Sequence, residues 1–319
     1  MSGRRVTLLA GGVGGAKMAE GLAGLCAADE LTIVGNVADD QEFHGLWVSP
    51  DIDTLTYSLA GLIDRQKGWG LAQDSSRTLD ALQRLGCDTW MYLGDQDFAT
   101  HIYRTEQRRR GVRPTLIAET IAQALGVRTR IVLPTDDRLQ TEVHTSEGWL
   151  SFQEYFVRWR CEPEVLDVSF AGQDQARPTP EALKAIRDAD LLVIAPSNPI
   201  VSIGPILALP ELRQAFVDAK AYKLAVSPLL GGRPVKGPAD RMLIAAGYSC
   251  DNFGVAQSYS GLIDALVIDA QDDADALALR EQGLDVLVTD TLMSNHIDKK
   301  RLAEDLLRFT ATQRPLSRP

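Results

Sequence analysis

The amino-acid sequence predicts an α/β fold of three layers, with a Rossmann-like, doubly wound, mainly parallel sheet and one β-rich, aromatic insertion. Three observations predict it. Short apolar runs without polar alternation recur along the chain, as strands buried on both faces of a parallel sheet do. Helical patterns separate these runs, and such alternation is typical of α/β folds. A glycine-rich turn joins the first run to the first helix, where doubly wound folds often bind phosphate.

Seven runs are the expected strands of this sheet: 6–10, 31–34, 130–133, 191–195, 223–226, 265–268 and 285–288. A weaker candidate is 90–93. Thr179 is the expected N-cap of a helix that begins at Pro180. Leu85-Gly86 and Leu125-Gly126 are expected helix stops.

Length and composition fit one α/β domain over 1–319, because 45% of the 319 residues are hydrophobic and 24% are charged. Lys and Arg number 33 against 43 Asp and Glu, so the net charge is −10. We therefore expect neither nucleic acid nor a membrane as partner. The four cysteines form no CxxC pair, and the first apolar run is too short for a signal peptide or a membrane span. A cytoplasmic protein is expected.

An insertion is expected over 141–178, where the strand and helix rhythm is interrupted. A strand over 142–145 and a turn over 146–148 precede an aromatic run. The run contains Trp149, Phe152, Tyr155, Phe156 and Trp159. These side chains suit the core, the wall of a pocket for a flat ring, or a dimer contact.

The glycine turn reads Gly11-Gly12-Val13-Gly14-Gly15-Ala16-Lys17-Met18. It lacks the Ser or Thr that follows Lys in a Walker A loop, and Lys17 occupies the third glycine position of GxGxxG. The second run leads into Gly35-Asn36, where an NAD-binding fold prefers an acid. We expect Gly12, Val13, Gly14, Gly15 and Lys17 to contact a phosphate or nucleotide; the alternative is a tight turn without a ligand.

Four acids, Asp39, Asp40, Asp51 and Asp53, fall within fifteen positions after the second run. Mg²⁺ binds one or two carboxylates together with substrate phosphates. Asp39, Asp40 and Asp53 are the expected metal ligands, and Asp53 and Asp51 the expected catalytic acids. Asp53 is preferred because the clearer helical pattern starts at Thr54. Alternatively, Ser49 and Pro50 start a helix whose first turn merely contains both acids.

Further polar loops follow other predicted strands. One contains Asp95, Thr100 and His101, with Arg104 beyond it, although a lone histidine or an arginine-rich face is also a common structural feature. Two loops rich in Pro, Gly and Ser contain Ser197 and Asn198, and then Ser227 and Gly237. Such rigid loops present backbone N–H and hydroxyl groups to a diphosphate or a base; two proline-rich turns are the alternative.

The chain resembles the 2-phospho-L-lactate transferases of coenzyme F-420 biosynthesis over essentially its whole length. The segments that carry the resemblance are Ala10-Gly11-Gly12-Val13-Gly14-Gly15-Ala16, Asn36-Val37-Ala38-Asp39-Asp40, Ser49-Pro50-Asp51-Ile52-Asp53-Thr54, Gly68-Trp69-Gly70, Leu93-Gly94-Asp95, Ala99-Thr100-His101, Phe152-Gln153-Glu154, Ala195-Pro196-Ser197-Asn198-Pro199 and Ser202-Ile203-Gly204-Pro205. One departure is Gln96, where the family usually has arginine; Arg104 could replace that contact.

The resemblance implies transfer of a phospho-lactyl, phosphoenolpyruvyl or related three-carbon phospho-acid group from a guanosine-diphospho donor to the ribityl hydroxyl of the deazaflavin Fo, with GMP as the leaving group. It implies Mg²⁺ and a homodimer. The glycine turn, Ser197, Asn198, Ser227 and Gly237 would then hold the nucleotide. The residues expected at Fo are Asp53, Asp95, Thr100, His101 and Arg104.

Two other functions are possible from the sequence. A nucleotide-sugar-binding regulatory protein of the same superfamily would bind a UDP-sugar and ignore Fo. An NAD-dependent dehydrogenase would bind nicotinamide, which Asn36 disfavours.

Overall fold

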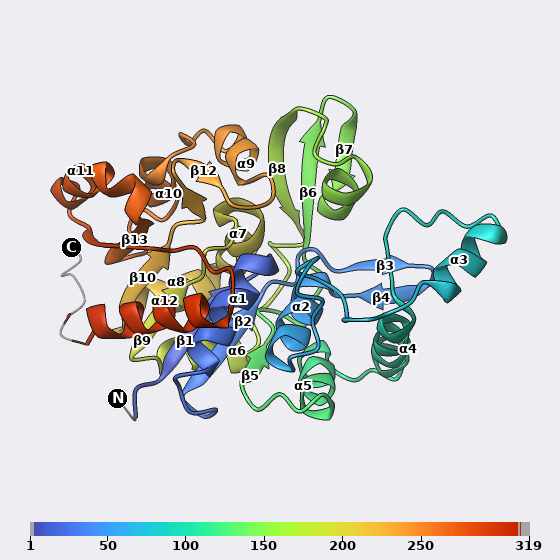
Figure 1. The fold of residues 1–319 in the computed structure, drawn as a ribbon. Helices are drawn as coiled ribbons and strands as arrows, with labels where there is room; N and C mark the ends of the chain where they lie inside the picture. Colours follow the sequence, from blue (N-terminus) through green and yellow to red (C-terminus); the bar gives the residue numbers. More distant parts are fainter. Residues whose placement is uncertain (1–2, 312, 314–319) are drawn as a thin grey trace.

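A seven-stranded parallel sheet forms the centre of the computed structural model, which describes residues 3–311 and 313 (Figure 1). The strand order is β14-β13-β10-β9-β1-β2-β5. The strands are β1 (Val6–Ala10), β2 (Leu31–Gly35), β5 (Arg130–Val132), β9 (Leu191–Ile194), β10 (Tyr222–Val226), β13 (Ala265–Asp269) and β14 (Asp285–Thr289). All seven expected strands are therefore confirmed, to within one residue at each end.

Alternate side chains of each strand enter two separate cores, which makes the fold three-layered. In β1, Leu8 packs into one core and Leu9 into the other. The Leu8 core is covered by α1 (Gly12–Ala23), α2 (Pro50–Leu59), α5 (Pro114–Ala124) and α12 (His296–Phe309). The Leu9 core is covered by α6 (Pro180–Arg187), α7 (Gly204–Leu207), α8 (Pro210–Asp218), α9 (Ala239–Ala245), α10 (Asn252–Ser258) and α11 (Ala276–Glu281).

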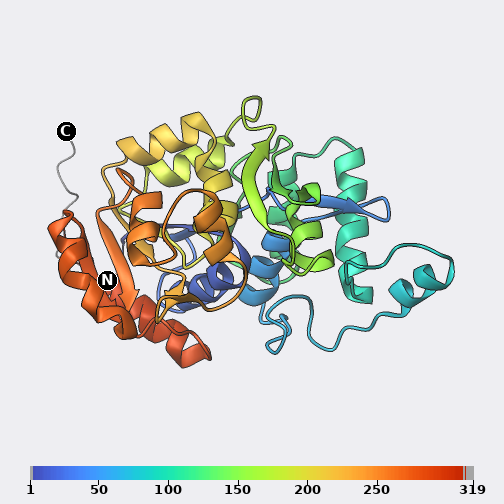
Figure 2. The same cartoon turned by 90° about the horizontal axis from the view of Figure 1, so that it is seen from above.

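Two smaller units extend from the sheet (Figures 1 and 2). From Gln140 to Ala171 the chain forms an antiparallel sheet of β6 (Gln140–Thr145), β7 (Gly148–Ser151) and β8 (Val165–Ala171), with the π-helix η1 (Glu154–Arg158) between the last two. The hairpin of β3 (Gln41–Phe43) and β4 (Leu46–Val48) projects toward α3 (Arg77–Arg84) and α4 (Asp95–Arg109). Short elements complete the chain: η2 (Pro199–Ile203), β11 (Leu229–Leu230), β12 (Arg233–Pro234) and η3 (Ala270–Asp275).

Three expectations about local structure are wrong. The segment from Asp95 to His101, expected to be a loop, is the start of helix α4. Residues 90–93 form no strand; Leu93 instead packs beside Leu79 and Phe98 in a small separate core. Helix α2 begins at Pro50 rather than at Thr54, because proline suits the first helical turn and the two acids favour its positive end. The Thr179 cap is confirmed, since its hydroxyl oxygen accepts the N–H of Ala182.

Helix ends follow the expected glycine rule. Gly86 and Gly126 have φ of +86° and +81°, in the left-handed region that ends helices. Among the residues that the structure describes, no single helix has both the length and the apolar composition of a membrane span; one pair of segments bent by 90°, Pro199–Leu207 with Pro210–Asp218, meets these criteria only when joined.

Helices α1 and α12 lie against each other across one face of the sheet (Figure 1), and Gly21 allows this approach. A Cβ at Gly21 would lie 2.3 Å from the backbone oxygen of Lys299 in α12. We expect Gly21→Ala to lower the free energy of unfolding by about 1–3 kcal/mol, since the clash outweighs the better helix propensity of alanine. Urea denaturation measures this.

The matched control is Gly24→Ala at the end of the same helix, where the nearest atom to an added Cβ is 3.4 Å away. Gly24→Ala should be neutral or slightly stabilising. Equal stability of both variants would contradict the assigned packing of α1 on α12.

Candidate functional site

A cavity of about 480 Å³ lies at the carboxyl edge of the central sheet. It is lined by the turn after β1, by the segments that follow β9, β10 and β14, and by side chains of α2 and α4. Loops at the carboxyl ends of parallel strands are where open α/β sheets bind ligands. Among the sequence-predicted site residues, those in the lining are Gly12, Val13, Gly14, Lys17, Asp39, Asp51, Asp53, His101, Ser197, Asn198, Ser227 and Gly237.

The glycine turn forms one side of this cavity because its backbone passes very close to the loop after β9. A Cβ at Gly14 would lie 2.2 Å from the backbone oxygen of Pro196. Gly12 has φ +62° and starts α1, and its N–H donates to the carboxylate of Asp51. Gly15 is not in the lining: a Cβ there would lie 2.9 Å from Ala10. Gly15 therefore serves packing, and the contacts available to a ligand come from Gly12, Val13 and Gly14.

Two lysines provide positive charge beside this turn. Lys17 and Lys236 both line the cavity. Burial lowers the pKa of Lys17, and the charges of Lys299 and Lys236 lower it further. The ammonium group of Lys236 donates to the backbone oxygen of Lys67 at 2.9 Å, so it ties two loops together at the cavity. An anion bound here would relieve the repulsion between the lysines, which favours a phosphate ligand.

The loops after β9 and β10 place polar groups next to the glycine turn. The hydroxyl of Ser197 donates to the backbone oxygen of Gly11 at 2.7 Å. The side-chain oxygen of Asn198 accepts two N–H groups and caps η2, while its Nδ2 is buried and has no partner in the described part of the chain. Ser227 donates to Asn252 at 2.7 Å. Of these residues, Asn198 offers the cavity an uncommitted donor.

The first turn of α2 and the segment after β2 bring two carboxylates to the cavity. Asp51 accepts hydrogen bonds from Asn36 Nδ2 at 3.0 Å and from the Gly12 backbone N–H, and burial raises its pKa to about 6. Burial raises the pKa of Asp39 well above its ordinary value, with further contributions from the charges of Asp51 and Asp40. Asp39 Oδ1 has no partner within the described residues. A cation between Asp39 and Asp51 would compensate these charges.

Asp40 does not line the cavity, which separates it from the other expected metal ligands. Its Oδ2 accepts hydrogen bonds from Ser49 Oγ at 2.7 Å and Trp47 Nε1 at 3.1 Å. Burial raises the pKa of this carboxyl to about 7. Asp40 therefore holds β4 and the start of α2 in place rather than facing a ligand.

Asp53 is fixed by a buried bidentate ion pair with Arg104 of α4. Arg104 Nη1 donates to Asp53 Oδ2 at 3.1 Å, and Nη2 donates to Oδ1. Asp53 is 4% exposed and lines the cavity, whereas Arg104 lies behind it and is not in the lining. The geometry therefore does not support Arg104 as a substitute for the arginine usual at position 96; it positions Asp53 instead.

Two further side chains of α4 face the cavity beside Asp53. Asp97 accepts a hydrogen bond from the Tyr57 hydroxyl at 2.7 Å, and burial raises the Asp97 pKa to about 6. His101 is 1% exposed; burial lowers its pKa to about 4, so its imidazole is neutral near pH 7. His101 Nδ1 lies 3.1 Å from Arg104 Nη1.

Asp95 and Thr100, both expected at the Fo site, do not line the cavity. Asp95 instead holds the start of α3: its carboxylate accepts the N–H of Thr78 at 2.8 Å and the hydroxyl of Ser75 at 2.5 Å. A carboxylate is favoured there by the positive helix end. Thr100 lies 3.1 Å from the hydroxyl of Tyr57.

An apolar wall completes the cavity, and part of it comes from the aromatic insertion. Phe152 and Phe156 line the cavity and stack with parallel rings 5.6 Å apart. Trp69 and Tyr92 line it as an edge-to-face pair, also 5.6 Å apart. Trp149 lies elsewhere, stacked on His144. The insertion therefore contributes both a wall and packing.

Several residues of the cavity lining were not among the site residues predicted from the sequence: Trp69, Met91, Tyr92, Asp97, Lys236, Thr291, Leu292 and Met293. The last three follow β14, so the rule that ligands bind at carboxyl strand ends could have indicated them. Met91 and Tyr92 lie in the segment expected to be a strand.

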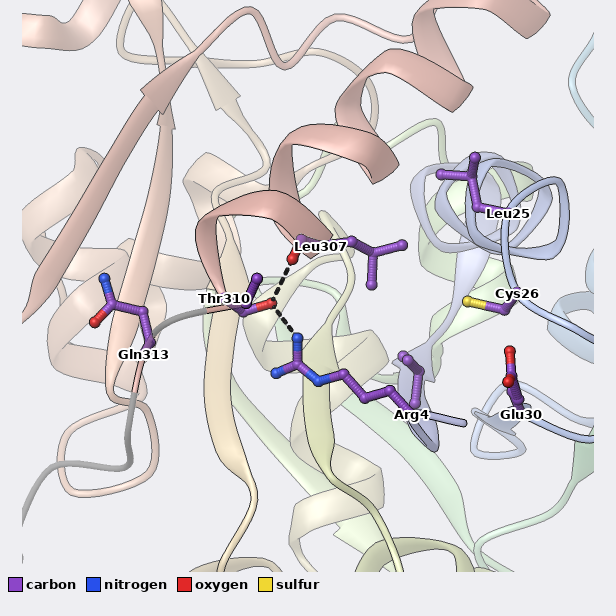
Figure 3. Close-up of a pocket in the computed structure, with 9 residues that line it drawn as sticks. Arg4, Leu25, Cys26, Glu30, Leu307, Thr310 and Gln313 are labelled. Carbon is purple, nitrogen blue, oxygen red and sulfur yellow. Dashed lines mark hydrogen bonds between the residues drawn. The ribbon is translucent and has the colours of Figure 1, made fainter. Parts of the chain in front are cut away.

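A second cavity, of about 390 Å³, lies at the opposite edge of the sheet (Figure 3). Val6 lines it, whereas the glycine turn follows Ala10 at the other end of the same strand. Arg4 is held there by a 2.8 Å hydrogen bond to Thr310. Burial raises the pKa of the Cys26 thiol in this cavity, which disfavours the reactive thiolate. We therefore assign the candidate site to the larger cavity.

The three-layer fold and the glycine turn at its carboxyl edge place the chain among the doubly wound α/β proteins. A model of the family 2-phospho-L-lactate transferase CofD matches residues 6–313. The 2-phospho-L-lactate transferase of Methanosarcina mazei is 36% identical over 297 residues, which cover 93% of this chain and 97% of the relative. The phosphoenolpyruvate transferase of Streptomyces coelicolor is 39% identical over 279 residues, covering 86% and 87%.

A solved structure of a UPF0052 family protein from Bacillus halodurans matches this chain with a TM-score of 0.63 and 16% sequence identity. The match covers 96% of this chain and 99% of the solved chain, so the two proteins share a fold. The sequence matches identify the family: this chain belongs to the 2-phospho-L-lactate transferase family and is a transferase.

The raised pKa of Asp40 predicts a specific pH dependence of stability. Because the folded protein raises this pKa above its unfolded value, the contribution of the protonated carboxyl is present at low pH and is lost as the pH rises through about 7. Asp40→Asn does not titrate. Between pH 5 and 7 the free energy of unfolding of the wild type should therefore fall relative to that of Asp40→Asn, by up to about 1.4 kcal/mol per pH unit.

Urea denaturation at both pH values, in EDTA, measures this change. Asp188→Asn is the matched control, because the Asp188 pKa is lowered by Lys184 and its contribution is constant over this range. Parallel pH dependence of Asp40→Asn and wild type would contradict the assigned environment of Asp40.

Proposed function

We propose that this transferase moves a phospho-lactyl, phosphoenolpyruvyl or related three-carbon phospho-acid group from a guanosine-diphospho donor to the ribityl hydroxyl of Fo, releasing GMP in coenzyme F-420 biosynthesis. The observation that carries the proposal is a single cavity that contains both a phosphate-type glycine turn with Lys17 and a carboxylate, Asp53, fixed by Arg104. The names of the relatives, which include both a 2-phospho-L-lactate transferase and a phosphoenolpyruvate transferase, support the choice of three-carbon acids.

The donor is assigned to the side of the cavity with the glycine turn. The N–H groups at the start of α1 and the ammonium groups of Lys17 and Lys236 suit its diphosphate. Asn198 Nδ2, which lacks a partner among the described residues, supplies another donor there. Ser227 and Gly237 extend this side toward the guanosine.

Fo is assigned to the aromatic side. Trp69, Tyr92, Phe152 and Phe156 offer faces and edges to a flat tricyclic ring. The ribityl chain then extends toward Asp53. This assignment gives the aromatic wall a function and leaves the lysines to the diphosphate.

Transfer requires an attacking oxygen, a leaving group and a destination for one proton. The ribityl hydroxyl oxygen forms a bond to the phosphorus that carries the three-carbon acid. The bond between that phosphorus and the bridging oxygen breaks, and GMP leaves with the oxygen. Asp53 orients the attacking hydroxyl and accepts its proton, while Arg104 keeps the carboxylate in place. Positioning and charge compensation are the main contributions of a protein to phosphoryl transfer.

Mg²⁺ is proposed as the cofactor, with Asp39 and Asp51 as its protein ligands. In the described residues, no group of three or more His, Cys, Asp or Glu is arranged to hold a metal. Two carboxylates completed by substrate oxygens suit Mg²⁺, however, and the unpartnered Oδ1 of buried Asp39 fits one ligand position. The ion would neutralise phosphoryl oxygens of the donor. Of the sequence-predicted ligands this keeps Asp39; Asp53 pairs with Arg104 and is assigned to the attacking hydroxyl instead, and Asp40 lies outside the cavity lining.

The direct test is to incubate the protein with Fo, Mg²⁺ and either the lactyl or the enolpyruvyl donor, and to detect GMP and the phosphodiester by mass spectrometry. Absence of product with both donors, together with calorimetric binding of a UDP-sugar, would favour the regulatory alternative instead. A homodimer is also proposed, and light scattering after size exclusion tests it.

Asp53→Asn should lower kcat at least about 100-fold, because asparagine cannot accept the hydroxyl proton. Steady-state kinetics at saturating substrates and Mg²⁺ measure this effect. Asp188→Asn, at the distant end of α6, is the matched control and should keep the wild-type kcat. A near-normal rate for folded Asp53→Asn would remove Asp53 from the catalytic role.

Asp39→Asn should raise the Mg²⁺ concentration for half-maximal activity on the order of 10-fold or more, since it removes a charged ligand. Asp40→Asn is the matched control: it changes the neighbouring acid outside the cavity lining and should leave the Mg²⁺ dependence near that of wild type. Full wild-type activity in EDTA would exclude the metal assignment altogether.

A further inference from the structure

His101 is a residue of the cavity lining, and one nitrogen of its imidazole has no partner among the described residues. His101 lies on α4, is 1% exposed and contributes to the cavity lining. Its Nε2 is buried and has no hydrogen-bond partner within the described part of the chain. Buried polar atoms in proteins are usually paired, so an unpaired one in a ligand cavity points to a missing partner.

Arg104 determines which ring nitrogen of His101 carries the proton. Arg104 Nη1 lies 3.1 Å from His101 Nδ1, and a guanidinium group donates hydrogen bonds but never accepts them. Nδ1 must therefore accept, and in the neutral ring the proton is on Nε2. The guanidinium is held in this orientation because it also donates to both oxygens of Asp53.

This tautomer excludes two familiar roles for the histidine. A protonated Nε2 cannot accept a proton from a substrate, and it has no lone pair for a metal ion. It can donate a hydrogen bond, and the partner that it lacks is an acceptor oxygen.

The surroundings indicate what kind of oxygen this is. The carboxylates of Asp53 and Asp97 lie on the same part of the cavity as His101; Asp53 Oδ2 is 3.8 Å from His101 Nδ1, and the charge of Asp53 raises the pKa of Asp97. A phosphate would meet repulsion here and has Lys17 and Lys236 beside the glycine turn. An uncharged hydroxyl oxygen is the acceptor that this environment favours.

We propose that His101 is a substrate-binding residue that acts as a neutral donor, with Nε2–H directed to a hydroxyl oxygen of the polyol chain of the acceptor substrate, and that Arg104 keeps it in this tautomer. The inference rests on the proposed function for the identity of that substrate. Arg104 thus orients two groups at once: Asp53 as an acceptor of hydrogen bonds and His101 as a donor. The pair distinguishes a hydroxyl, which donates and accepts, from an ether or a carbonyl, which only accepts.

Two amide variants distinguish a hydrogen-bond donor at position 101 from a base, a metal ligand or a structural residue. The amide nitrogen of His101→Gln can occupy the position of Nε2–H, whereas the shorter side chain of His101→Asn places its oxygen near Nδ1 and leaves no donor in the cavity. We expect His101→Asn to weaken the binding of Fo about 10- to 100-fold in calorimetry, and His101→Gln to stay within about threefold of wild type. The KM for the guanosine-linked donor should not change in either variant.

Equal losses in both variants would assign His101 a merely structural role and overturn the proposal. A loss of kcat at saturating Fo in His101→Gln, with unchanged Fo binding, would indicate a base or a metal ligand and would also overturn it. Calorimetry with Fo alone requires no transfer, so a wild type that binds Fo but forms no product would refute the proposed reaction without deciding the role of His101.

The tautomer is measured independently by nitrogen NMR of protein labelled at its four histidines, with His101→Asn used to assign the signal. The expected pattern is a neutral ring with protonated Nε2, in the presence and absence of Fo. A protonated Nδ1 or an imidazolium near pH 7 would overturn the proposal.

Discussion

The buried ion pair between Asp53 and Arg104 is the interaction on which the geometry of the site depends. It joins α2 to α4, two helices that the central sheet does not connect directly, and Arg104 also binds the backbone oxygen of Trp47 in β4. Removing one partner of such a pair leaves an uncompensated buried charge and typically costs about 3–5 kcal/mol. Two charges buried beside a cavity are therefore better explained by the orientation they impose than by the stability they add.

The sheet could be predicted from the sequence because its strands are buried on both faces. An apolar run such as Leu191–Ile194 would be unfavourable on the surface, so burial is the expected outcome. A loop rich in turn residues follows this run. The segment over 90–93 is also apolar but forms no strand; its Met91 and Tyr92 line the cavity. Local apolarity cannot distinguish a strand from the wall of a pocket; that distinction depends on tertiary contacts.

The candidate site could be predicted only in part. The glycine turn and Asp53 follow from local patterns, and both lie at the cavity. The roles of Asp95 and Arg104 did not follow, because each is decided by a partner far away in sequence: Ser75 and Thr78 for the former, Asp53 for the latter. Residue type and position after a strand indicate that a side chain is near a site, but not whether its polar atoms are already committed.

The charges divide the cavity into two parts, although the whole chain is acidic. Lys17 and Lys236 repel each other beside the glycine turn, and the carboxylates of Asp39 and Asp51 are held in a buried position nearby. Like charges lie close together in each set, and a phosphate beside the lysines and a cation beside the carboxylates would compensate them. A diphosphate that arrives with Mg²⁺ satisfies both requirements, whereas either one alone would leave the other set of like charges unrelieved. The arrangement therefore supports the proposed function, in which a metal-bound diphosphate would be the unit that enters the site and the uncharged acceptor would bind separately beside Asp53.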